Sequence, residues 1–194
     1  IPVSEIGLGA WQLGEHSGWK NLSEDQAQKL VHKALDLGVN FFDTAPVYGG
    51  GTSEIRLGKA LKGVDRSQIV LNTKFGRDET GKVDFSATHI RKSIEGSLKR
   101  MQTDYIDSVI IHSPPIELLD GTKNDHYEML EDLISEGKIK AYGASIDSYD
   151  EIKLLLSTTN AKAVQVFFNI FHQDAVRAFD LIKEKKVGFK AKIP

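Results

Sequence analysis

Short apolar runs recur along this chain about every 30 residues, which is the length of one βα unit. This recurrence restricts the possible folds more than any other feature. Seven runs rich in β-branched and aromatic residues are predicted strands: residues 6–8, 39–43, 69–74, 106–112, 141–145, 163–168 and 188–193. Amphipathic stretches of helical length separate them, and strands that are apolar on both faces are typical of parallel sheets covered by helices. The sequence therefore predicts an α/β protein with a parallel sheet.

Several helix boundaries can be placed from local chemistry. Ser23 with Gln26, and Ser148 with Glu151, fit the capping-box pattern in which a hydroxyl and a side chain three residues later satisfy each other's backbone N–H groups. Further caps and helix ends are predicted at Ser53, Ser86, Gly38 and Gly137. These boundaries support the alternation of strands and helices.

Periodicity leaves two closures of the sheet open, a doubly wound open sheet or a (β/α)8 TIM barrel. No linker or shift in composition divides the chain, so residues 1–194 are expected to form a single domain. A complete eight-unit barrel has about 250 residues. If the fold is a barrel, we expect it to be incomplete, with about six βα units plus a seventh strand and with its C-terminal part missing.

Composition excludes several classes of partner. A formal net charge of −2 supplies no basic field, so neither nucleic acid nor an anionic membrane surface is an expected partner. No apolar stretch approaches the roughly 18 residues of a membrane span. The absence of cysteine excludes disulfides and thiolate catalysis, and it fits a cytoplasmic location. The histidines lack metal-ligand spacing, so no metal is expected.

Three ionisable residues end three successive predicted strands: Asp43, Lys74 and His112. The carboxyl ends of parallel strands meet at one edge of a sheet, and Tyr48 lies on the loop that leaves the strand of Asp43. We expect an Asp43–Lys74 ion pair that keeps both groups charged. Lys74 would then stabilise the phenolate form of Tyr48, which makes the phenol a general acid. A neutral His112 would hold a carbonyl oxygen on which negative charge develops.

The motifs around these residues resemble those of the aldo-keto reductase family. Residues 43–49 followed by 53–58 are similar to the family signature, and residues 72–76 and 104–114 carry similar motifs around Lys74 and His112. The resemblance covers nearly the whole chain in order. It implies a (β/α)8 barrel that binds NADPH, or less often NADH, and a catalytic tetrad of Asp43, Tyr48, Lys74 and His112. In that tetrad Tyr48 is the proton donor.

The same resemblance implies sites for cofactor and substrate. The implied cofactor-binding residues are Asp43, Ser145 and Gln165, the last two contacting the nicotinamide carboxamide, and the implied substrate-binding residues are Trp11, Tyr48 and His112. Two positions depart from the family pattern. Ile146 stands where the family commonly has Asn, and Lys192 stands where many members have a Tyr that stacks on the nicotinamide. The family's phosphate-binding loops follow the seventh strand, so NADPH is assigned here from the family's usual preference.

These residues are compatible with three functions. The first is reduction of a small aldehyde or ketone, with hydride from NADPH and a proton from Tyr48. The second is a regulatory protein of the same fold that binds nicotinamide nucleotide with slow or no turnover, favoured by Ile146 and Lys192 and opposed by the complete tetrad. The third is Schiff-base chemistry at Lys74, which is disfavoured because Asp43 would keep that amine protonated.

Overall fold

The strands form one parallel sheet in the order of the sequence. The structure, a computed structural model, describes residues 3–15 and 21–193. The strands of the sheet are β1 Leu8–Gly9, β2 Phe41–Asp43, β3 Val70–Phe75, β4 Ser108–Ile111, β5 Tyr142–Ser145, β6 Ala163–Phe167 and β7 Gly188–Lys192. Each pairs in parallel with the next. A doubly wound sheet would reverse its strand order at a switch point, so this order selects the barrel, here an incomplete one.

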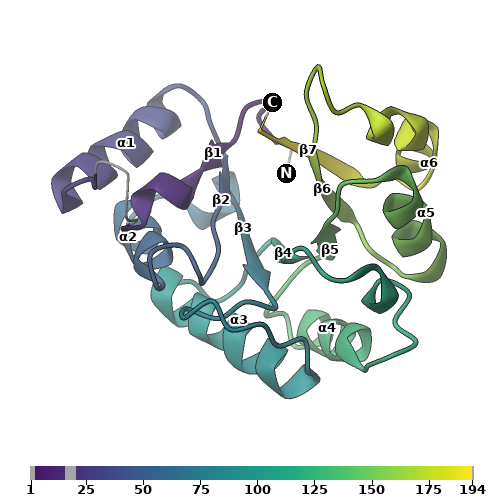
Figure 1. Ribbon diagram of the computed structural model, residues 1–194. Helices are drawn as coiled ribbons and strands as arrows, with labels where there is room; N and C mark the ends of the chain where they lie inside the picture. Colours follow the sequence, from purple (N-terminus) through teal and green to yellow (C-terminus); the bar gives the residue numbers. More distant parts are fainter. Residues whose placement is uncertain (1–2, 16–20, 194) are drawn as a thin grey trace.

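The helices pack on the outer face of this sheet, which curves around a central axis (Figure 1). The α-helices are α1 Glu24–Asp36, α2 Thr52–Ala60, α3 Ala87–Met101, α4 His126–Ser135, α5 Tyr149–Thr158 and α6 Phe179–Glu184. All six residues of β3 are buried, since the helices cover one face of the strand and the barrel interior covers the other. Within the described ranges, no helix is both long enough and apolar enough to cross a membrane.

The seven predicted strands are all present, with shifted boundaries. The predicted strand at 6–8 pairs with β2 only from Leu8 to Gly9, and Ile6 is 74% exposed because it precedes the pairing. The predicted strand at 106–112 contracts to Ser108–Ile111, while Ile106 forms an isolated bridge with Ile139. Apolar runs therefore located the strands, but backbone pairing set their ends.

Most of the predicted helix boundaries are confirmed, and one is wrong. The capping boxes at Ser23 and Ser148 form as expected, the Ser86 hydroxyl accepts a hydrogen bond from the backbone of His89, and the glycines expected at helix ends have positive φ. Ser53 is not a cap. Gly51, at φ 88°, turns the chain into α2 early, and the buried Ser53 hydroxyl donates to the carbonyl of Ala10 at 2.6 Å. Ser53 thus ties α2 to the segment that follows β1.

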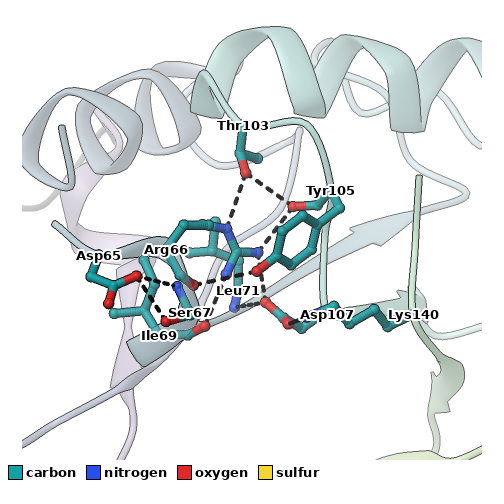
Figure 2. Close-up of polar contacts among 9 residues, drawn as sticks. All are labelled: Asp65, Arg66, Ser67, Ile69, Leu71, Thr103, Tyr105, Asp107 and Lys140. Carbon is teal, nitrogen blue, oxygen red and sulfur yellow. Dashed lines mark hydrogen bonds and ion pairs between the residues drawn. The ribbon is translucent and has the colours of Figure 1, made fainter. Parts of the chain in front are cut away.

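A polar network ties β3 to β4 at the amino ends of the strands (Figure 2). Arg66 donates to the carboxylate of Asp107 at 2.6 Å and to the carbonyl of Tyr105 at 3.0 Å. Asp107 also accepts from the backbone N–H of Leu71 at 3.0 Å and from Lys140 at 2.9 Å. The ring of Tyr105 lies 4.0 Å from each of the two cationic groups, Arg66 and Lys140. This end of the barrel is thus fixed by charge and stacking, away from the predicted site.

Candidate active site

The structure brings the four predicted tetrad residues together at the carboxyl ends of the strands. Asp43 is the last residue of β2, Lys74 is the penultimate residue of β3, and His112 directly follows β4. The backbone N–H of His112 donates to the carbonyl of Phe75 at 2.9 Å, which holds His112 beside the end of β3. Tyr48 lies in the turn between β2 and α2. The four predicted residues therefore come from the ends of three adjacent strands and one short turn.

Asp43 and Lys74 form the expected buried ion pair. The Lys74 ammonium donates to both carboxylate oxygens of Asp43, at 3.0 and 2.9 Å, and to the carbonyl of Thr44 at 2.8 Å. The two side chains are only 2% and 8% exposed. Burial alone would lower the pKa of Lys74, but the charges and hydrogen bonds of Asp43 and Tyr48 together outweigh burial and raise that pKa above its usual value. Lys74 is therefore an ammonium at physiological pH, which opposes its use as a Schiff-base amine.

Asp43 also binds two residues that were not predicted from the sequence. The amide of Asn72 donates to Asp43 Oδ1 at 2.5 Å, and Lys190 Nζ lies 2.5 Å from the same oxygen. Burial would raise the pKa of Asp43, but Lys74 and Lys190 hold it below its usual range. The carboxylate is therefore ionised and neutralised from two directions.

Tyr48 is close to both the Lys74 ammonium and the His112 imidazole. Lys74 Nζ is 4.8 Å from the centroid of the Tyr48 ring, and interaction with the Tyr48 side chain helps to raise the pKa of Lys74. The rings of Tyr48 and His112 meet edge to face, with centroids 6.1 Å apart and planes at 89°. Tyr48 is half-buried. A phenol, a cation and an imidazole thus border the same space.

His112 is neutral at physiological pH. Burial, together with the positive charges of Lys74 and Arg77, lowers the pKa of His112 to about 3. A neutral imidazole carries one N–H donor and one acceptor. Its Nδ1 is buried and has no hydrogen-bond partner among residues 3–15 and 21–193. The ring therefore retains hydrogen-bonding capacity that the fold does not use.

Ser145 and Gln165 lie opposite each other on β5 and β6. Gln165 Oε1 is buried and finds no partner within the part of the chain that the structure describes. A primary carboxamide such as that of nicotinamide has N–H groups that can donate a hydrogen bond to this oxygen. Gln165 therefore fits that ligand. Ser145 is already engaged, because Lys192 donates to its hydroxyl at 2.8 Å and also pairs with Asp147 at 3.1 Å. Lys192, at the position where many family members have a stacking Tyr, thus binds a hydroxyl instead.

The remaining predicted residues lie at the same end of the barrel. Trp11 belongs to the short 3-10 helix Ala10–Leu13 that follows β1, and β1 pairs Gly9 with Asp43. Ile146 is buried just beyond β5 and brings no side-chain amide. Across the described ranges, no group of three His, Cys, Asp or Glu side chains is placed to hold a metal ion.

Comparison with known proteins identifies the family. The profile of the Aldo/keto reductase family matches residues 5–192. The chain is 39% identical to L-galactose dehydrogenase of Arabidopsis thaliana over 174 residues. These aligned residues cover 89% of this chain and 54% of that protein. Aldo-keto reductase AKR11C1 from Bacillus halodurans, in its holo form, superimposes with a TM-score of 0.84 at 35% identity, over 96% of this chain and 61% of that one. The chain belongs to the aldo/keto reductase family, and it spans about half the length of the curated relatives it matches.

Two other similar proteins bear on the cofactor. An aldo/keto reductase from Klebsiella pneumoniae, solved in complex with NADP and acetate, superimposes with a TM-score of 0.80 at 26% identity, covering 97% of this chain and 63% of that one. The NADH-specific methylglyoxal reductase of Escherichia coli is 31% identical over 184 residues, or 88% of this chain and 56% of that protein. Relatives of this chain therefore include proteins that bind NADP and one that is specific for NADH.

Proposed function

We propose that the protein containing this chain reduces the carbonyl group of small aldehydes or ketones with NADPH, with Tyr48 as the proton donor. The observation that carries this proposal is that the Tyr48 ring is close to both the Lys74 ammonium and the neutral His112 ring. This arrangement offers a proton, a charge that stabilises the phenol after it has lost the proton, and a hydrogen-bond donor for a carbonyl oxygen.

The proposed mechanism assigns one task to each residue. NADPH, when bound, supplies the hydride that reduces the carbonyl carbon. His112, neutral because its pKa is low, donates a hydrogen bond to the carbonyl oxygen and orients it. Tyr48 transfers its hydroxyl proton to that oxygen as negative charge grows there. Lys74 stabilises the resulting tyrosinate, and Asp43 holds Lys74 in place.

Gln165 and Ser145 are the proposed holders of the nicotinamide carboxamide. Gln165 offers an unpartnered buried acceptor, whereas Ser145 must share its hydroxyl with Lys192. The third proposed cofactor residue, Asp43, already binds Lys74, Lys190 and Asn72, so a contact with the cofactor would share one of its oxygens. We propose NADPH as the cofactor, with NADH as the alternative, because similar proteins use each.

The substrate we propose is a small carbonyl compound that enters beside Trp11, Tyr48 and His112. Two relatives, L-galactose dehydrogenase and methylglyoxal reductase, are named for small oxygenated molecules.

The hydrogen bond from Lys192 to Ser145 favours one competing function, a regulatory protein that binds the nucleotide and turns over slowly.

The test is steady-state oxidation of NADPH with a panel of small aldehydes, using the full-length protein. We expect Tyr48→Phe to lower kcat by about 10²–10⁴ and to leave the Kd for NADPH within about twofold of the wild type. Tyr105→Phe makes the same chemical change at the amino end of the barrel and should leave kcat unaltered. A Tyr48→Phe variant with wild-type kcat would reject the assigned role. NADPH binding without turnover in the wild type would support the regulatory function instead.

A further inference from the structure

A second lysine binds the carboxylate of the predicted tetrad. Lys190 Nζ lies 2.5 Å from Asp43 Oδ1, the oxygen to which Lys74 donates at 3.0 Å. Lys190 is on β7 and Asp43 is on β2, and these strands are not neighbours in the sheet. The contact therefore crosses the barrel interior.

The surroundings of Lys190 leave Asp43 as its main anchor. The Lys190 side chain is 25% exposed, and its ammonium lies 5.2 Å from the centroid of the Phe41 ring. In the described part of the protein, Nζ makes no hydrogen bond of good geometry, so the close ion pair holds it. The charged groups that act on it are Asp43 on β2, Lys74 on β3 and Lys192 on β7. The Asp43 carboxylate thus forms ion pairs with two buried ammonium groups, those of Lys74 and Lys190.

We propose that Lys190 is a positioning residue of this active site, which fixes the Asp43 carboxylate against Lys74 and adds a second positive charge to the Asp43–Lys74 pair. This inference rests on the proposed reductase function. When both lysines are protonated, the cluster of Asp43, Lys74 and Lys190 carries one net positive charge. When Lys190 is neutral, the cluster is neutral. A positive cluster stabilises the tyrosinate that proton transfer leaves at Tyr48.

Lys190 can change its charge within a working pH range. Burial lowers the pKa of Lys190 to about 8; the nearby charges of Lys74 and Lys192 act in the same direction and Asp43 acts against them. Lys74, with its raised pKa, stays protonated through the same range. Lys190 is therefore the member of the pair whose titration would change the rate of reduction.

The experiment measures kcat and kcat/KM against pH for the wild type, Lys190→Arg and Lys190→Met. Arg keeps the charge at every pH, and Met removes it at every pH while keeping much of the apolar stem. The wild type should follow the Arg variant below about pH 8 and approach the Met variant above it. We expect Lys190→Met to lower kcat about tenfold in the lower range and to lack the inflection near pH 8. Lys183→Met, on an exposed lysine of α6, should reproduce the wild-type profile.

A second readout does not depend on turnover. In protein labelled with ¹³C at lysine Cε, one resonance should titrate near pH 8 and be missing from the spectrum of Lys190→Met. If the Met variant fails to fold, the Arg variant decides: it should remain active above pH 8 where the wild type declines. Parallel profiles of the Arg variant and the wild type through that range would overturn the inference. A wild type that is inactive at every pH would instead reject the proposed function.

Discussion

Arg66 Nη2 donates a 2.6 Å hydrogen bond to Asp107 Oδ2, joining the turn before β3 to the turn before β4. The Asp107 side chain is 9% exposed and also accepts from the backbone of Leu71. Asp107→Ala leaves the Arg66 guanidinium and the Leu71 N–H without this acceptor, so we expect a loss of about 3 kcal/mol in the free energy of unfolding. Urea denaturation measures it, and kcat should not change because the network lies at the amino ends of the strands.

The matched control is Asp25→Ala. Asp25 pairs with Lys29 on the exposed face of α1, where both side chains are at least 70% exposed. Exposed pairs contribute little, so this variant should lose no more than about 1 kcal/mol. Equal losses from the two substitutions would show that the Arg66–Asp107 bond is not a special support of the barrel.

Two histidines, the half-buried His112 and the buried His126, should make the fold sensitive to acid. Burial is the main cause that lowers the pKa of His112 to about 3 and of His126 to about 4. A histidine in the unfolded chain has a pKa of about 6.5. Below that pH these two side chains are protonated in the unfolded chain but stay neutral in the folded protein, which favours unfolding. The contribution of these two histidines to the free energy of unfolding is thus fully present above about pH 6.5 and is lost as the pH falls toward 4 for His126 and 3 for His112.

Glutamine variants isolate the contribution of each histidine. We expect His112→Gln and His126→Gln each to lose less stability than the wild type between about pH 6.5 and 4, measured by urea denaturation at fixed ionic strength. If a variant loses stability as steeply as the wild type, the histidine it replaces does not carry the effect.

Gln165 should show opposite effects on stability and on cofactor binding. Its buried Oε1 has no acceptor role within the described fold, so Gln165→Met removes an unsatisfied group at similar length. We expect thermal stability to stay the same or to rise by up to about 1 kcal/mol, while the Kd for NADPH rises at least about tenfold. Thermal denaturation and fluorescence titration measure the two. Gln68→Met, at an exposed position near the amino end, should leave the Kd unaltered, and an unchanged Kd in Gln165→Met would remove Gln165 from the proposed cofactor site.

Gly143 allows β5 and β6 to approach closely. A Cβ at this position would lie 1.8 Å from the carbonyl oxygen of Ala163, so Gly143→Ala must push the two strands apart. We expect a loss of at least about 3 kcal/mol in unfolding free energy, with weaker NADPH binding because Ser145 and Gln165 face each other across the same pair of strands. In Gly188→Ala the nearest atom, a carbonyl oxygen, would be 3.6 Å away, and stability should change by less than about 1 kcal/mol. Similar losses in both variants would contradict the steric explanation.

The parts of this structure that sequence predicted best depend on local pattern. Strand ends follow from apolar runs, and parallel pairing then places Asp43, Lys74 and His112 at one edge without further information. The spacing of apolar runs could not distinguish an open sheet from a barrel, because both folds are built from the same βα unit. The choice between them is decided by the strand order. The Ser53 cap failed for a similar reason, since the left-handed turn at Gly51 sets where the helix begins.

Lys190 shows what local pattern leaves out. The predicted strand at 188–193 carries lysines at two alternating positions, 190 and 192, which places both on one face of an otherwise apolar segment. That signal was visible in the sequence. Its partner was not, because the curvature of the whole sheet brings β7 within reach of Asp43.

The cross-barrel contact also orders events when the chain folds. The Asp43–Lys74 pair can form once β2 and β3 associate, whereas Lys190 reaches Asp43 only after every intervening unit has docked. Contacts between segments distant in sequence close late, because they carry the loop-closure entropy of all that lies between. During refolding, recovery of the full pH profile of activity should therefore lag behind burial of the core. The length of that delay would measure how late β7 docks onto the sheet.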